Sequence, residues 1–471
     1  MPPEPAIAES TDWGVSLNGE GPKSTEYVPL TELGNAARLV AAQGTSMRFC
    51  HPWARWLVWD GRRWQLDETG EATRRAKGTV QGLLAEAAAT ADDESRKRLA
   101  AHALRSQSDR AIRAMLSLAQ SELGIPILPD QLDVDYGLFN VSNGTVHLEV
   151  AEVLPHQRAD LITKLARVAY DPEAEAPLWQ AFLKTVVPSS EIREFLARLV
   201  GSSLAGGGNE QRLPIFFGVG ANGKSTLQKV WLELLGDYGQ TAPAQTFLAE
   251  RRDSIPNDVA RLRGARFVVA SEIGEGRRLN EELVKRMTGG DRLVARYMRG
   301  EFFEFDARFL PLLVTNHRPE IRGTDEAIWR RICLVPFTVT IPPEERDPQM
   351  AERLLKELPG ILNWAMDGCL EWKARGLDPP PAVLAATSAY RSDMDVVGGF
   401  LTELCIEDDN ASVKSSELFN RYGYWASSVG EEALTQKAFA LRLQERGFRQ
   451  KRTNEARWWI GLALRAEKSD A

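Results

Sequence analysis

The clearest chemical signal in the sequence is a glycine-rich segment that ends in a lysine and a serine, Gly218-Val219-Gly220-Ala221-Asn222-Gly223-Lys224-Ser225. It matches G-x-x-x-x-G-K-[ST] and stands between an apolar run and a helical stretch, the context of a phosphate-binding loop. The loop N–H groups and the helix N-terminus favour an anion. We expect Lys224 to reach the β- and γ-phosphates of a nucleotide and Ser225 to hold Mg²⁺. The predicted nucleotide-binding residues are Gly218, Gly220, Asn222, Gly223, Lys224, Ser225 and Thr226.

Two polar residues at the ends of later apolar runs are candidates for acting on the attacking water. Glu272 ends the run that begins at Phe267, and its carboxylate can polarise water and support a metal. Many ATPases carry another acid at the position of Ser271. For Glu272, activation of water is therefore favoured over metal ligation. Asn316 follows the run Phe309–Val314 and can orient the water. The alternatives are a surface glutamate at a strand end and an ordinary turn asparagine.

A pair of arginines, Arg330 and Arg331, precedes the last apolar run of this region. An arginine that reaches the nucleotide of a neighbouring subunit can stabilise the charge of the transition state. As an isolated pair, these arginines would usually form a solvated or ion-paired face.

The elements that must position these residues are predicted by four apolar runs, at 213–217, 267–270, 309–314 and 332–337. Helical stretches between some of them, one of them at 224–235, indicate an α/β domain with a largely parallel sheet. Pro311 argues against a regular central strand at 309–314, so the ends of that strand stay open.

The flanking regions predict a chain of several domains. We expect a helix at 31–43, hairpins that turn at Asp60-Gly61 and Asn143-Gly144, and two helices within 74–122. The predicted domains are a disordered tail (1–26), a mixed α+β N-terminal region (27–172), a helical connector (173–212), the α/β core (213–345), a helical segment with a linker at 377–386 (346–386) and a C-terminal domain (387–471).

Composition excludes several classes of protein. The 471 residues are 43% hydrophobic with a net charge of -7, which argues against a wholly disordered chain and requires any basic face to be local. Four cysteines lie far apart without a C-x-x-C pair, so neither a cysteine-zinc site nor a disulfide framework is indicated. No run of about 18 apolar residues predicts a membrane span, and no apolar leader begins the chain, so we expect a cytoplasmic location.

The C-terminal residues 437–465 carry eight basic groups and two acids. A helix that ends at Gly447, a basic turn at Arg449–Arg452 and a strand at Trp458–Ile460 outline a winged helix, whose cations would contact DNA phosphates. The DNA-contact candidates here are Arg449, Lys451 and Arg452. The alternative is a small helical cap that only packs on the core.

The motifs together resemble the superfamily 3 helicases of phages, plasmids and DNA viruses, and in particular the phage/plasmid primase-helicase family that includes the poxvirus primase-helicase. The resembling stretches are G-V-G-A-N-G-K-S-T (218–226), V-V-A-S-E (268–272), K-R-M-T-G-G-D-R-L-V-A-R-Y (285–297), L-L-V-T-N-H-R-P (312–319) and W-R-R-I (329–332). The resemblance extends upstream through N-G-T-V-H-L (143–148) to the stretches T-E-L-G-N-A and W-L-V-W-D-G-R-R-W, and downstream into the C-terminal region, so it covers most of the chain.

The resemblance implies a hexameric AAA+ ring that uses ATP and Mg²⁺ to translocate on single-stranded or forked DNA, encoded by a phage or mobile element or by its bacterial host. It implies Lys224 and Ser225 as Walker A, Glu272 as the Walker B acid, Asn316 as sensor 1, and Arg331, with Arg330 as the alternative, as the arginine finger. It also implies a channel hairpin with its tip near Met298–Gly300, and the DNA-facing candidates are then Lys285, Arg296 and Arg299.

Other functions stay open at the level of sequence. A non-unwinding replication initiator or loader that binds origin DNA would use the same ATP site, whereas a small-molecule kinase is disfavoured by the Arg330–Arg331 pair and the basic C-terminus. The D-x-D at Asp133–Asp135 is short and no Ser-x-His follows it, so we expect a separate protein to supply any primase or polymerase.

Overall fold

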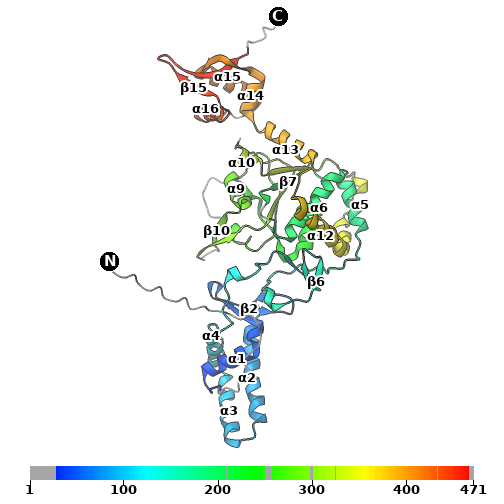
Figure 1. Cartoon of the computed structure of the whole chain (residues 1–471), viewed down its shortest axis with the longest axis vertical. Coiled ribbons are helices and arrows are strands. Elements are labelled where there is room, and N and C mark those ends of the chain that lie inside the picture. The colour runs from blue at the N-terminus through cyan, green and yellow to red at the C-terminus, as the bar shows by residue number, and fades with distance from the viewer. Residues whose placement is uncertain are drawn as a thin grey trace, which may run out of the picture. The chain divides into compact units, whose positions relative to one another are not determined.

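The computed structural model describes residues 28–207, 210–249, 257–296, 301–323, 325–431 and 433–465 (Figure 1). The predicted tail 1–26 and Arg299 of the predicted channel hairpin lie outside these ranges. The chain divides into two compact units, Met1–Leu132 and Asp133–Ala471, so the predicted region 27–172 extends across this division. In the described ranges, no helix has both the length and the apolar character that a membrane span needs.

The first unit packs four helices with one small antiparallel sheet. Its elements are α1 (Glu32–Gln43), β1 (Met47–Cys50), β2 (Arg55–Trp59), β3 (Trp64–Leu66), α2 (Glu71–Ala89), α3 (Asp93–Ser106) and α4 (Asp109–Ala119). The first helix and the hairpin around Asp60-Gly61 are confirmed. Residues 74–122 hold parts of three helices rather than two, because Asp92 and Ser108 each accept a backbone N–H and start a new helix.

The second unit is built on a five-stranded parallel sheet. Its strands are β7 (Leu213–Phe217), β8 (Gly239–Thr241), β9 (Phe267–Ser271), β12 (Leu310–Thr315) and β13 (Ile332–Pro336), in the order β13-β7-β12-β9-β8. The four predicted strands and the α/β class are confirmed. Strand β8 was not predicted, because its three residues, Gly-Gln-Thr, form no apolar run.

Helices cover both faces of this sheet, which explains why its strands read as continuous apolar runs. One core joins Phe216, Phe267 and Val314 to α5 (Pro177–Val186), α6 (Ser190–Leu204), α7 (Lys224–Leu235) and α12 (Leu358–Arg375). The other joins Ile215 and Leu313 to α9 (Glu281–Gly289) and neighbouring segments. Shorter helices are α8 (Asn257–Ala260), α10 (Glu326–Trp329) and α11 (Met350–Leu354).

Pro311 is accommodated inside β12 by the register of the sheet. It pairs with Val268 of β9, whereas pairing with β7 begins two residues later, at Leu313. The proline therefore lies ahead of the part of β12 that is paired on both sides, and the strand persists despite the missing N–H.

Two antiparallel sheets accompany the core. Strands β4 (Leu138–Val141), β5 (Gly144–His147) and β6 (Glu152–Leu154) form one of them and confirm the hairpin at Asn143-Gly144. Strands β10 (Arg292–Arg296) and β11 (Phe302–Asp306) form the other and pair Arg296 with Phe302. These two strands are the arms of the predicted channel hairpin, and its tip at 298–300 lies outside the described residues.

The C-terminal residues form a subdomain with its own core. Its elements are α14 (Val396–Leu404), β14 (Cys405–Lys414), α15 (Ser415–Ser428), α16 (Gln436–Glu445), β15 (Arg449–Arg452) and β16 (Arg457–Leu464), with sheet order β14-β16-β15. Phe400, Tyr422, Phe439 and Trp459 fill the core. The predicted helix before Gly447 and the final strand are confirmed. Arg449–Arg452, predicted as a turn, form a strand because they pair with residues 457–460.

A helix precedes this subdomain where a linker was predicted. Residues from Pro381 to Asp393 form α13, so part of the predicted linker 377–386 is helical. Thr387 Oγ1 accepts the N–H of Leu334 on β13 at 2.9 Å, and Tyr390 is fully buried. Prolines at 380 and 381 suit the start of a helix, where no backbone donor is needed.

Candidate nucleotide-binding site

The glycine-rich loop leaves β7 and enters α7 through backbone that only glycine adopts readily. Gly220 and Gly223 have φ of 106° and 80°. A Cβ on Gly223 would lie 2.5 Å from Cγ1 of Val186, and one on Gly218 would lie 2.3 Å from the carbonyl oxygen of Phe337. These glycines are therefore required by the fold of the loop, and the loop delivers Lys224 as the first residue of α7.

Lys224 is a buried cation with neutral partners. Its side chain is almost inaccessible, and Nζ donates to Gly218 O at 2.7 Å, to Asn222 Oδ1 at 3.0 Å and to Asn316 Oδ1 at 3.1 Å. Burial lowers the pKa of Lys224 to about 8. Because none of its three acceptors is charged, the site has an unneutralised positive centre that a phosphate would fit.

The strand order brings the two water-directed candidates beside Lys224. Strand β12 lies between β7 and β9, so Asn316 after β12 and Glu272 after β9 emerge at the same edge as the loop. The N–H of Glu272 donates to Val314 O at 3.2 Å. Its φ of 67° is the left-handed region, which costs a non-glycine residue about 1 kcal/mol or more. Such strain is typical of functional positions.

These residues line a common cavity of about 350 Å³. The structure therefore brings together four predicted residues, Lys224, Ser225, Glu272 and Asn316. Further lining residues that the sequence analysis did not name are Gln228, Lys229, Leu232 and Glu233 from α7 and Thr315 from β12. Their positions three to eight residues after Ser225 on a single helix are the signal that could have identified those on α7.

The donor set fits a nucleotide-bound Mg²⁺ better than a metal held by protein alone. Among the described residues, no group of three or more His, Cys, Asp or Glu side chains is arranged to bind a metal. Mg²⁺ keeps several waters and usually takes one or two protein ligands together with phosphates. The Ser225 hydroxyl and the Glu272 carboxylate, both at the cavity, suit that role.

The two arginines before β13 have different environments. Arg331 is buried, and it donates from Nε to Thr288 Oγ1 at 2.9 Å and from Nη1 to Ala327 O. Arg330 is exposed, with a 3.1 Å bond from Nη2 to Gln211 Oε1. The motifs favour Arg331 for contact with a neighbouring subunit, whereas Arg330 is the exposed residue of the pair.

Helix α9 holds the stretch that carries these arginines. We call residues 320–323 and 325–331 the arginine segment. Lys285 of α9 donates to both carboxylate oxygens of Asp325, at 3.0 and 3.1 Å. Desolvation raises the pKa of Asp325, but bonds from Lys285 and from the backbone amides of Ile328 and Ala327 outweigh it and hold the pKa below its usual value. Lys285 is therefore engaged by a carboxylate of its own chain.

The other DNA-contact candidates lie on exposed strands. Arg296 on β10 stacks over Phe302 at 5.1 Å from the ring centroid, and Phe302 is 54% exposed. Arg449, Lys451 and Arg452 on β15 are all exposed. An exposed cation beside an exposed aromatic ring, and a strand rich in cations, are both compatible with contacts to nucleic acid.

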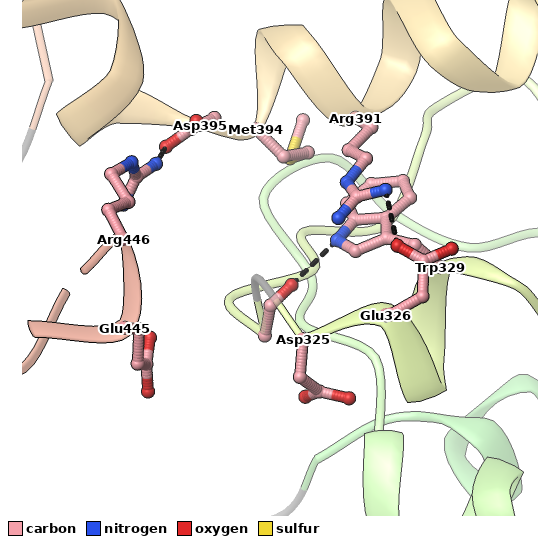
Figure 2. Close-up of a pocket in the computed structure, with 9 residues that line it drawn as sticks. Asp325, Glu326, Trp329, Arg391, Met394, Asp395, Glu445 and Arg446 are labelled. Atoms are coloured by element: carbon pink, nitrogen blue, oxygen red, sulfur yellow. Dashed lines mark hydrogen bonds and ion pairs between the residues drawn. The ribbon is translucent and has the colours of Figure 1, made fainter. Parts of the chain in front are cut away.

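A second and larger cavity, of about 520 Å³, lies next to the arginine segment (Figure 2). It is lined by Gly323, Asp325, Glu326, Trp329, Arg391, Met394, Asp395, Glu445 and Arg446. Glu326 pairs with Arg391 at 2.8 Å, and Asp395 pairs with Arg446, as Figure 2 shows. The other two carboxylates of the lining are also paired, Asp325 with Lys285 and Glu445 with Arg442, so the cavity offers no clear site for a charged ligand.

The D-x-D motif has a structural role. Asp133 accepts the N–H and the hydroxyl of Thr163 at 2.6 and 2.5 Å, and Asp135 accepts the N–H of Gly137 at 2.8 Å. Both carboxylates therefore accept hydrogen bonds that stabilise the fold.

The parallel sheet, the glycine-rich loop and the buried lysine are consistent with an α/β nucleotide-binding core. Residues 36–188 match the family model described as D5 N terminal like. The chain is 25% identical over 323 residues to a protein of Acanthamoeba polyphaga mimivirus named as a candidate helicase, covering 63% of this chain and 34% of that protein. A Frog virus 3 protein with the same kind of name is 28% identical over 268 residues, 53% of this chain and 28% of that one.

A protein of African swine fever virus named as a candidate primase is 22% identical over 324 residues, or 62% of this chain and 34% of that protein. A solved structure titled as the C-terminal region of NrS-1 aligns with 88% of this chain and 96% of its own, at 9% identity and a TM-score of 0.47. The chain spans about a third of the length of the curated relatives it matches. The chain is therefore similar to the D5 N terminal like family and to helicase- and primase-named viral proteins, which confirms the resemblance drawn from its motifs.

Proposed function

We propose that the chain is the ATP-dependent motor of a superfamily 3 DNA helicase, an AAA+ ATPase that translocates on single-stranded DNA as a homo-oligomeric, hexameric ring. The observation that carries the proposal is the meeting of Lys224, Glu272 and Asn316 at a single cavity, each delivered by a different strand end of a parallel sheet. The similarity to helicase-named viral proteins supports it. A phage, plasmid or other mobile element in a bacterial cytoplasm is the expected setting.

Each residue at the cavity has a role in this proposal. Lys224 and the loop N–H groups bind the β- and γ-phosphates of ATP, and Ser225 with Glu272 would hold Mg²⁺, which when bound offsets phosphate charge. Glu272 also polarises the attacking water. Asn316 Oδ1 accepts a hydrogen bond from Lys224 Nζ. When phosphate takes over Lys224, the Asn316 carboxamide becomes available to orient that water.

We propose that hydrolysis is completed between subunits by Arg330. Its guanidinium is exposed at the start of the β13 edge of the sheet, whereas Arg331 is packed into its own chain. An arginine supplied in trans stabilises charge that develops on the transferred phosphoryl group. This role makes a ring necessary for activity.

The C-terminal subdomain supports a second candidate function, a non-unwinding initiator that binds duplex origin DNA. We propose that it is a winged helix, because three helices are combined with a three-stranded antiparallel sheet whose β15–β16 hairpin carries exposed cations. An initiator and a helicase share the ATP site but differ in strand displacement.

Measurement of ATPase and of fork unwinding on the same preparation tests the proposal. The wild-type chain should hydrolyse ATP and displace a strand, and Lys224→Ala should lose both by several orders of magnitude. Lys184→Ala removes an exposed lysine from α5 and should behave as wild type. ATPase without strand displacement on any forked substrate would favour the initiator, and near-normal ATPase in Lys224→Ala would refute the nucleotide site.

A further inference from the structure

Helix α9 presents one face to the arginine segment, and every polar residue on that face contacts it. Glu281, Lys285 and Thr288 are spaced by four and three residues, so they lie on one side of the helix. Glu281 Oε1 accepts the N–H groups of Arg322 and Gly323 at 2.9 and 3.0 Å. Together with the Lys285–Asp325 and Thr288–Arg331 bonds, this contact fixes the segment near its beginning, middle and end.

The partner of Lys285, Asp325, caps the short helix that leads into the arginine pair. Asp325 is the N-cap of α10 and accepts the N–H of Ile328 at 3.1 Å. Helix α10 ends at Trp329, immediately before Arg330 and Arg331. The helix has four residues, so a shift at its cap is transmitted to the arginine pair with little flexible chain between them.

The Lys285–Asp325 pair is accessible to a competing anion. The side chains are 34% and 50% exposed, so neither is sealed from solvent. Exposed ion pairs hold only weakly. A DNA phosphate, which is an anion of comparable charge, can therefore replace Asp325 as the partner of Lys285. Neither the Glu281 contact nor the Thr288 contact joins two opposite charges. A phosphate would therefore not replace a partner in these contacts as it can in the Lys285–Asp325 pair.

We infer that Lys285 and Asp325 form a DNA-responsive tether that positions the Arg330–Arg331 pair. This inference rests on the proposed function, in which Lys285 faces single-stranded DNA and Arg330 acts on a neighbouring nucleotide. Without DNA the tether holds the arginine segment against α9. A phosphate that binds Lys285 releases Asp325, so the middle of the segment and Arg330 gain freedom to reach the adjacent subunit while the Glu281 and Thr288 contacts still hold its two ends. Lys285 and Asp325 are positioning residues rather than catalytic residues.

The decisive variant is Asp325→Asn. Asparagine keeps the N-cap acceptor and leaves Lys285 in place for DNA, so only the ion pair is lost. The DNA-free ATPase rate should rise about two- to fivefold, the range that an exposed ion pair can shift an equilibrium. The DNA-saturated rate should stay unchanged, so the stimulation ratio falls, and affinity for an oligothymidine should be no weaker. Lys285→Ala should raise the DNA-free rate equally but weaken oligothymidine binding.

A matched control is Glu282→Gln, which removes an exposed carboxylate from α9 and should leave both rates unchanged. Hydrogen exchange of the wild-type chain gives a measurement that needs no variant: exchange in residues 325–331 should increase when oligothymidine is added without nucleotide. Wild-type rates in Asp325→Asn, or unchanged exchange, would overturn the tether. A wild-type ring that hydrolyses ATP but is insensitive to DNA would also overturn it, whereas a chain without any ATPase would instead refute the proposed function.

Discussion

At the scale of residues, Lys224 links burial to a pH-dependent affinity for nucleotide. Its pKa is lowered to about 8 by desolvation, and phosphate requires the protonated ammonium. Above pH 8 the empty site loses this proton, so ATP binding should weaken by up to about tenfold per pH unit. Calorimetric titration of ATP between pH 7 and 9.5 measures the effect. Lys224→Arg keeps its charge across that range and should show a flat profile. A flat wild-type profile would contradict the lowered pKa of Lys224.

Glu272 separates binding from turnover. Glu272→Gln preserves the shape of the side chain but removes the base, so ATP binding should persist while hydrolysis falls by about 10²-fold or more. Equilibrium binding of a fluorescent ATP analogue and steady-state ATPase assays test the two halves. The strained backbone at this position is shared by both residues and therefore cancels in the comparison. Loss of binding together with hydrolysis would identify Glu272 as mainly a metal ligand or a structural residue.

At the scale of elements, the arginine segment assigns different roles to two adjacent arginines. Arg330→Ala should leave folding intact and remove ATPase, and mixing this variant with Lys224→Ala should restore part of the rate, because some interfaces then pair an intact loop with an intact Arg330.

Arg331→Ala should instead lower the free energy of unfolding by about 1–3 kcal/mol, since it leaves buried partners on Thr288 and Ala327 unsatisfied.

Thermal melts and mixing titrations distinguish these outcomes. If rings form but no mixing ratio of Arg330→Ala with Lys224→Ala restores activity, while Arg331→Ala does restore it, the original preference for Arg331 from the sequence is correct. In that case the Arg331–Thr288 bond must open when subunits assemble.

The elements that the sequence predicted well are those whose signal is local. The strands 213–217 and 332–337 are apolar runs, and the helix after Lys224 begins where the loop ends, so pattern alone located them. Strand β15 could not be recognised, because Arg449–Arg452 contains no apolar residue and exists only by pairing with β16. Similarly, α13 depends on packing of Tyr390 into the core.

The residues of the candidate site also differ in whether local sequence or long-range contacts determine their role. Lys224, Ser225, Glu272 and Asn316 were found because each follows a strand or begins a helix, positions that the sequence marks. The difference between Arg330 and Arg331 was hidden, because which of two adjacent side chains is buried depends on Thr288, far away along the chain. The Lys285–Asp325 pair was hidden for the same reason.

At the scale of the whole molecule, the acidic chain concentrates positive charge in its C-terminal residues. Residues 437–465 hold eight basic groups and two acids within a chain of net charge -7. Some of the eight serve the fold, since Arg446 pairs with Asp395 and Arg465 donates to Cys405 O. The exposed strand β15 retains Arg449, Lys451 and Arg452, which makes it the part of the subdomain best suited to phosphate contacts.

Replacement of Arg449, Lys451 and Arg452 by glutamine in the full chain should therefore flatten the salt dependence of duplex binding. Each phosphate contact releases a counterion, so the slope of log K against log salt should fall by about 0.9 per contact, or roughly 2.7 for three. Full-length protein is preferable to truncation after residue 386, because that cut would divide α13, whose Tyr390 is buried in the core. Fluorescence anisotropy between 50 and 200 mM salt gives the slope, and ATPase should be unchanged since the nucleotide cavity is lined by residues 224–316.

Glutamine at Lys97, Arg110 and Arg113, three exposed cations of the N-terminal helices, removes the same charge and should leave the slope unaltered. If the β15 variant and this control bind duplex with the same slope as wild type, the C-terminal subdomain is a packing cap, and the initiator alternative loses its physical basis.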